Sequence, residues 1–181
     1  LSDAACLFVV EEYEHARARG AEIYCELSGF GASSDACSAF KLNKSEEPGA
    51  RALEKALFMA RRQADEIDYY CALGVSMQFL DIRETRMVKR VFREHAKKLP
   101  VSSIKSMMGH PLGTAGAVQA ATCAMAIRRH AVPPTINYEE PDPECDLDYV
   151  PNEARARQVR NAMVYTLGNG GSNAALVLSA C

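Results

Sequence analysis

The chain has 181 residues, of which 48% are hydrophobic and 24% are charged, an ordinary composition for a soluble globular protein. The net charge of −2 and the scattered basic residues argue against nucleic acid and anionic membranes as partners. We recognise neither a signal peptide nor an apolar run of membrane-spanning length. Because the chain begins with Leu1 and runs almost at once into apolar sequence, we expect a piece of a longer protein. A cytoplasmic location is a separate expectation.

The seven cysteines lie far apart in the sequence, mostly among small or apolar neighbours. They form no C-x-x-C pair, and an odd number does not suit a disulfide framework. We therefore expect buried, reduced thiols and no metal site. A thiol- or metal-dependent module stays open as an alternative, although the spacing gives it little support.

The first part of the chain predicts two strands around a short helix. Residues 4–10 are continuously apolar, which is typical of a strand buried on both faces. Residues 11–19 begin with acidic and end with basic side chains, and this order predicts a helix that Gly20 closes. Residues 21–30 alternate as a second strand does, and residues 31–47 are rich in turn-forming residues.

The middle of the chain alternates helices and strands. Residues 50–64 carry apolar side chains at i, i+3, i+4 and i+7, which predicts an amphipathic helix. Residues 67–73 form a strand candidate, and residues 83–98 a second helix. Strands that alternate with helices indicate an α/β fold.

The last part begins with the short segment 101–103 and a loop around His110 that contains several glycines. Residues 114–127 are small and apolar on every side, as expected for a helix at the centre of a protein. Residues 131–161 are rich in proline and acidic residues and predict a surface excursion. Residues 162–167 and 174–178 then predict two strands of a hairpin.

The first candidate site is the stretch 105–117, where His110 lies in a tight loop before the small-residue helix. An imidazole held there could donate a hydrogen bond to a developing oxyanion or shuttle a proton. A nearby helix N-terminus would favour its neutral form, and Lys105 could place a positive charge beside it. From spacing alone, a structural histidine with an exposed lysine is the favoured interpretation.

The second candidate is the hairpin tip, Gly168-Asn169-Gly170-Gly171. Its glycines allow close approach of the backbone to a ligand, and its amides could stabilise an oxyanion. A simple tight turn is the alternative. No helix follows, so the pattern is not a phosphate-binding fingerprint.

The third candidate, residues 72–76, ends a strand ahead of Asp81 and Glu84. None of these side chains is reactive by pattern. On the residues alone we interpret the segment as a core strand followed by a solvated helix start.

Several motifs follow one another across nearly the whole chain: Val10 to Ala16, Arg19 to Ala21, Phe30 to Ala36, Val101 to Ala117, Val132 to Asn137, Cys145 to Arg155 and the glycine hairpin. In this order they resemble the elongating β-ketoacyl-acyl-carrier-protein synthases. The resemblance implies a thiolase-like α/β fold, with helices on a mixed sheet and a central apolar helix. Residues 1–47 would hold the end of the first half and its connection, and residues 48–181 the C-terminal half.

The resemblance also implies a reaction. Such enzymes load an acyl chain onto a cysteine of the first half, decarboxylate malonyl-acyl-carrier protein and join the two carbon units in a Claisen condensation. They need no cofactor beyond the phosphopantetheine arm of the acyl carrier protein. The expected partners are that carrier and a second subunit, in a homodimer or a ketosynthase heterodimer.

Matching the motifs residue by residue assigns His110 to the second active-site histidine of the family and Lys105 to its lysine. The first histidine is replaced by Leu73, which can neither donate a hydrogen bond nor carry a proton. The motif around the nucleophilic cysteine is absent from this chain.

Further departures fall on the path of the acyl and pantetheine groups. Val75 and Met77 replace two threonines that would touch the pantetheine arm. Asn169 replaces a gating phenylalanine within the substrate-binding tip 168–171, and Leu167 replaces another phenylalanine. Gln119 stands where a glutamate is usual, which would remove a charge from the surroundings of the lysine.

Two functions of different classes are favoured over the thiol- or metal-dependent module at this point. The chain is either a fragment of a 3-oxoacyl-acyl-carrier-protein synthase, inactive alone because the nucleophile is absent, or part of a non-catalytic partner that resembles a chain-length factor. The sequence does not decide between fatty-acid and polyketide synthesis.

Overall fold

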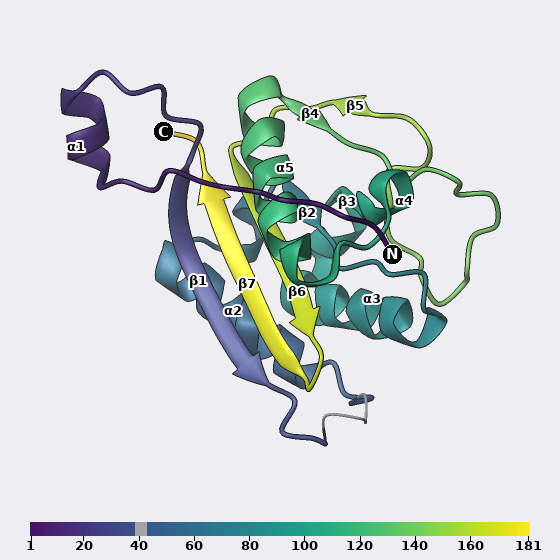
Figure 1. Ribbon diagram of the computed structural model, residues 1–181. Helices are drawn as coiled ribbons and strands as arrows, with labels where there is room; N and C mark the ends of the chain where they lie inside the picture. The colour runs from purple at the N-terminus through teal and green to yellow at the C-terminus, as the bar shows by residue number, and fades with distance from the viewer. Residues whose placement is uncertain (39–42) are drawn as a thin grey trace.

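The structure is a computed structural model that describes residues 1–38 and 43–181. Its centre is a five-stranded mixed sheet with the strand order β1-β7-β6-β2-β3 (Figure 1). The strands of this sheet are β1 (Glu26–Ser34), β2 (Tyr69–Cys71), β3 (Val101–Ser102), β6 (Asn161–Gly168) and β7 (Ser172–Ser179). The α-helices are α1 (Tyr13–Ala18), α2 (Glu47–Ala60), α3 (Gln78–Phe92), α4 (Lys105–Met108) and α5 (Ala115–Arg129). The small second sheet pairs β4 (Ala131–Val132) with β5 (Arg155–Ala156), and single 3₁₀ turns lie at Ala64–Glu66, Arg93–Lys97 and Leu112–Thr114.

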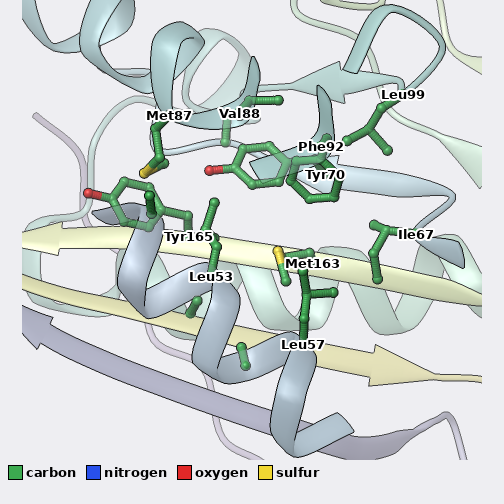
Figure 2. Close-up of a cluster of buried hydrophobic side chains, with 14 of the residues drawn as sticks. Leu53, Leu57, Ile67, Tyr70, Met87, Val88, Phe92, Leu99, Met163 and Tyr165 are labelled. Carbon is green, nitrogen blue, oxygen red and sulfur yellow. The ribbon is translucent and has the colours of Figure 1, made fainter. Parts of the chain in front are cut away.

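Helices cover both faces of the large sheet. The predicted apolar face of α2 is buried, and with α3 it closes one hydrophobic core against β6 and β7. In that core the rings of Tyr70 and Phe92 form a T-shaped pair, with 6.0 Å between ring centroids (Figure 2). Gly29 and Gly31 of β1 let α2 approach closely, since an added Cβ at either position would collide with backbone oxygens of α2.

The opposite face carries α5. Cys123, Ile127 and several alanines of this helix pack on β2, β6 and β7 in a second core. The helix is not enclosed on every side, because Met125 on its other face is partly exposed. The expected central helix therefore exists, and in this chain it covers the sheet with one face.

The parallel strands bring two distant loops together. β2 runs parallel to β3 and to β6, so the carboxyl ends of β2 and β3 lie at the same edge of the sheet. The segment after β2 begins at Ala72, and the segment after β3 leads to Lys105. This topology places the first and third sequence candidates side by side. The predicted hairpin is confirmed as β6 and β7, which pair antiparallel throughout.

The prediction of a buried strand at 4–10 is wrong. This segment has no regular secondary structure, and Leu7 is 98% exposed and Val9 85% exposed. Cys6 contacts the carbonyl oxygen of Ala117 as the segment crosses α5 (Figure 1). An apolar run becomes a strand only beside another strand, and in the described part of the chain none pairs with it.

Other elements differ from the predictions mainly at their ends. The second predicted strand lies at Glu26–Ser34 and pairs with β7, so this part of the expected connecting segment 1–47 is an edge strand of the same sheet. The helix expected over 83–98 begins earlier, at Gln78, and Arg93 with φ of 50° ends it. The helix expected over 50–64 ends at Ala60, where Arg61 adopts a left-handed conformation. Residues 39–42 of the turn-rich stretch lie outside the described residues.

Candidate active site

The backbone of Leu73 is held from both sides by charged side chains. Nζ of Lys105 donates a hydrogen bond of 2.6 Å to the carbonyl oxygen of Leu73. On the other side, the Glu84 carboxylate accepts the amide of Leu73 at 2.8 Å and the amide of Gly74 at 3.0 Å. Hydrogen bonds to charged groups are stronger than those between neutral groups, so this loop has a fixed path. We call Lys105 and Glu84 together the clamp.

The lysine of the clamp is buried, contrary to its possible role as an exposed residue. It is 8% exposed because α4, a single turn after β3, directs it beneath the Leu73 loop. Burial lowers the pKa of Lys105, and the negative groups Glu84 and Asp81 act in the opposite direction. These acidic side chains therefore favour the charged ammonium against the cost of burial.

The carboxylate of the clamp was missed by the sequence interpretation, which took Glu84 as part of a solvated helix start. It is 7% exposed, and Tyr70 also donates its hydroxyl to Glu84 at 3.0 Å. Burial raises the pKa of Glu84, although the amides of Gly74 and Leu73 counteract this effect. A usable signal existed, because Glu84 stands at the helical spacing of the buried residues Leu80 and Val88 and so lies on the apolar face.

Gln119 of α5 binds the strand ends below the Leu73 loop. Its side-chain nitrogen lies 2.7 Å from the carbonyl oxygen of Ala72, 3.0 Å from that of Tyr165 and 3.2 Å from that of Cys71. Its own oxygen, Oε1, is buried without a partner. A carboxylate could not donate to these carbonyls, so the amide suits this position in the present chain. The expected effect of Gln119 on the lysine stays a prediction.

His110 lies in the loop between α4 and the next 3₁₀ turn, as the motif predicted. Its backbone oxygen accepts the amide of Ser2 at 3.1 Å, and its Nδ1 is buried without a hydrogen-bond partner. Burial is the main cause that lowers the pKa of His110, and the nearby positive charge of Lys105 adds to it. This shift favours the neutral form of the imidazole.

The two residues expected at the pantetheine arm follow the clamped loop into α3. The amide of Val75 donates to Asp81 at 3.1 Å, and Val75 is partly buried against the larger core. Met77 is 49% exposed at the N-terminus of α3. Burial raises the pKa of Asp81, so its carboxylate is costly to keep charged and gains from its backbone donors.

The hairpin tip is a tight turn anchored by its last residue. The amide of Gly171 donates to the carbonyl oxygen of Gly168 at 3.1 Å, so this amide is already used within the turn. Gly170 and Gly171 have φ of 85° and 80°, which favours glycine at both positions. An added Cβ at Gly171 would also collide with Asp35, whereas Asn169 is exposed.

A cavity of about 690 Å³ opens beside the clamp. Both clamp residues line it, together with the stacked pair Tyr138 and Tyr149, whose rings lie 6.2 Å apart. These tyrosines come from the surface excursion, which therefore forms part of the cavity wall. Neither His110 nor the hairpin tip lines this cavity.

Within the described residues, no group of three or more His, Cys, Asp or Glu side chains is arranged to hold a metal ion. Cys71 and Cys123 are buried, reduced thiols as predicted, whereas Cys181 is exposed. In the same part of the chain, no helix combines the length and the apolar character that a membrane span requires.

With this geometry established, comparison with known proteins identifies the family. Residues 24–139 match the model of the β-ketoacyl synthase C-terminal domain. The chain belongs to the β-ketoacyl synthase family. The α/β fold of the thiolase-like ketosynthases, expected from the motifs, is thereby confirmed.

Two curated relatives illustrate the range of the family. The chain is 45% identical over 179 residues to 3-oxoacyl-[acyl-carrier-protein] synthase 2 of Coxiella burnetii, covering 99% of this chain and 43% of the relative. It is also 45% identical over 179 residues to the ketoacyl synthase alpha subunit of the tetracenomycin polyketide synthase of Streptomyces glaucescens, with 99% and 42% covered. The chain thus spans less than half the length of these relatives.

Two solved structures agree with the fold. One is a ketosynthase in complex with a type II polyketide acyl carrier protein, with a TM-score of 0.91 and 37% identity over 94% of this chain and 42% of the other. The second is the ishigamide ketosynthase/chain length factor, with a TM-score of 0.88 and 36% identity over 93% of this chain and 41% of the other.

Proposed function

We propose that this chain is the C-terminal half of a ketosynthase that acts on thioesters carried by an acyl carrier protein, in fatty-acid or polyketide synthesis. Residues 48–181 would form the second thiolase-like half, and the first half would supply the nucleophilic cysteine. The substrate would reach the site on the phosphopantetheine arm. A cytoplasmic location and a pairing with a second ketosynthase subunit belong to the same proposal.

The single observation that carries this proposal is the clamp. Lys105 and Glu84 fix the backbone of residue 73 through hydrogen bonds of 2.6 Å to its carbonyl and 2.8 Å to its amide. Leu73 itself gains nothing chemical from such close support. A side chain that must meet a substrate does gain from it, because a preorganised donor needs no rearrangement during the reaction.

His110 is the remaining group that could assist decarboxylation. A neutral imidazole carries one N–H, which would donate to the thioester oxygen of a malonyl group as negative charge develops there. Lys105 would act indirectly, since its Nζ binds the Leu73 carbonyl and its charge favours the neutral form of His110.

Leu73 should weaken this chemistry. Removing one oxyanion donor typically costs about 10²–10³ in rate. The chain without its first half has no nucleophile, so we expect it to carry out no condensation by itself.

The test is malonyl-acyl-carrier-protein decarboxylation by the natural protein that contains this chain, compared with its Leu73→His variant. We expect the variant to be faster by about tenfold or more, because the clamp presents the new imidazole where Leu73 now lies. Leu57→His, at a buried position of α2, is the control and should gain nothing. Equal rates for wild type and Leu73→His would contradict the proposal.

A non-catalytic partner that resembles a chain-length factor is the second candidate, and the apolar side chain of Leu73 favours it. In that case the protein copurifies from its source with a separate ketosynthase that carries both histidines and the cysteine. Purification of a homodimer with decarboxylase activity would exclude this candidate.

A further inference from the structure

Three consecutive residues of α3 hold three different segments of the chain. Arg83, Glu84 and Thr85 are all buried, with 4%, 7% and 2% exposed. Glu84 holds the Leu73 loop, and Thr85 lies within hydrogen-bond distance of the Tyr149 hydroxyl in the surface excursion. Arg83 reaches the residues that anchor the hairpin tip, and neither the sequence motifs nor the clamp explains why an arginine is buried there.

Arg83 meets Asp35 through two parallel hydrogen bonds. Nη2 donates to Oδ1 of Asp35 at 2.8 Å and Nη1 to Oδ2 at 3.1 Å, while Nε donates to the carbonyl oxygen of Ser45 at 2.9 Å. Only 4% of the Arg83 side chain and 1% of the Asp35 side chain are exposed. Such a planar, two-pronged pair fixes direction as well as distance, which a lysine could not do.

Asp35 connects Arg83 to the tip through hydrogen bonds. Its amide donates to the carbonyl oxygen of Gly171 at 2.8 Å, and its Oδ1 accepts the side-chain amide of Asn173 at 2.8 Å. Asn173 in turn donates to Gly171 at 3.1 Å and accepts the hydroxyl of Tyr165 at 2.6 Å. The missing Cβ of Gly171 makes room for Asp35.

We propose that Arg83 is a positioning residue: its buried ion pair with Asp35 sets the conformation of the glycine-rich tip 168–171. This inference rests on the proposed function, because a fixed tip matters most if the exposed Asn169 borders the path of a thioester substrate. Because Glu84 is the next residue along α3, one helix would then position both the tip and the Leu73 loop.

The test is amide hydrogen exchange in the natural protein that contains this chain. In Arg83→Met we expect the amides of the tip to exchange about tenfold faster or more, because Asp35 loses its partner and releases Gly171. The amides of β2 and α5 should keep their wild-type rates. Arg83→Lys keeps the positive charge but cannot form the two parallel hydrogen bonds, so it should give an intermediate increase in the exchange rate of the tip amides.

Two further variants separate positioning from general destabilisation. Arg86→Met removes an arginine of the same helix from an exposed pair with Glu144 and should leave the tip unchanged. The double variant Asp35→Asn with Arg83→Met should restore much of the protection of the tip, since the neutral side chain introduced at position 35 would still accept the amide of Asn173. Unchanged exchange at the tip in both Arg83 variants, or an equal increase in β2 and α5, would overturn the proposal.

Kinetic measurements on Arg83→Lys test the proposed function separately from the role of Arg83 at the tip. If the protein is a ketosynthase, Arg83→Lys should raise KM for the carrier-bound thioester about tenfold more than it lowers kcat for decarboxylation. A protein without any such activity would refute the proposed function, whereas the exchange rates would still decide whether Arg83 positions the tip.

Discussion

The Leu73 loop and the hairpin tip are each held by a buried charged residue of α3, but they differ in the side chain that the fixed backbone presents. At the Leu73 loop, charged side chains fix the backbone, while the side chain itself is chemically inert. At the tip, the backbone is fixed by a buried ion pair through Asp35, while the exposed Asn169 is polar and accessible. The two regions therefore differ in the side chain that their fixed backbone presents, which is apolar at residue 73 and polar at residue 169.

The largest expected effect comes from Gln119→Glu, which removes hydrogen bonds below the Leu73 loop and leaves the tip unchanged. A carboxylate there would face the carbonyl oxygens of Cys71, Ala72 and Tyr165 without a donor. We expect a loss of about 3 kcal/mol or more in the free energy of unfolding, measured by urea titration at pH 7. Gln158→Glu, at an exposed position, is the control and should change little.

The loss of stability in Gln119→Glu should depend on pH in one direction. Burial would raise the pKa of the new carboxyl group, so the protein should be most stable while the group is protonated. The loss should therefore be small at low pH and grow as the pH rises from the ordinary carboxyl pKa of the unfolded chain toward the raised pKa of the folded state. A loss that shrinks with rising pH would contradict the arrangement around Gln119.

At the tip, two glycine variants separate backbone strain from crowding. Both Gly170 and Gly171 have positive φ, but only an added Cβ at Gly171 would collide with Asp35. Gly170→Ala should cost about 1 kcal/mol from strain alone, and Gly171→Ala about 2–3 kcal/mol because it also displaces Asp35. Thermal unfolding of the two variants measures the difference, and equal losses would mean that Asp35 does not anchor the tip.

The smallest effect concerns His110. Because burial lowers its pKa in the folded state, the unfolded chain binds the proton more readily, and stability should fall as the pH drops below the ordinary value of 6.5. In His110→Gln this part of the pH dependence should disappear, as urea midpoints measured between about pH 7.5 and 5.5 would show. Titration of His110 above 6.5 by nuclear magnetic resonance would contradict the environment described here.

The sequence allowed the parts of the fold that depend on local pattern to be predicted. The glycine hairpin, α2, α5 and the loop around His110 all follow from residue spacing or from a contiguous motif. The strand expected at 4–10 was wrong because pairing depends on a neighbouring strand, which no local pattern reports.

The supports of the site were harder to predict than its motifs. Helical spacing could have placed Glu84 on a buried face, but the amides that it accepts lie ten and eleven residues away along the chain. Arg83 and Asp35 are separated by 48 residues, and their contact depends on how α3 and the end of β1 are packed. A single sequence contains no signal for such a partner.

The most direct test of the central claim is the exchange rate of the Leu73 and Gly74 amides in wild type and in Glu84→Gln. The variant replaces one acceptor oxygen by a donor, so one of the two amides loses its partner. If the clamp holds this loop, both amides exchange slowly in the wild type, and at least one of them exchanges about tenfold faster or more in the variant, while Glu54→Gln on the exposed face of α2 changes neither. Equal rates in wild type and Glu84→Gln would contradict the account.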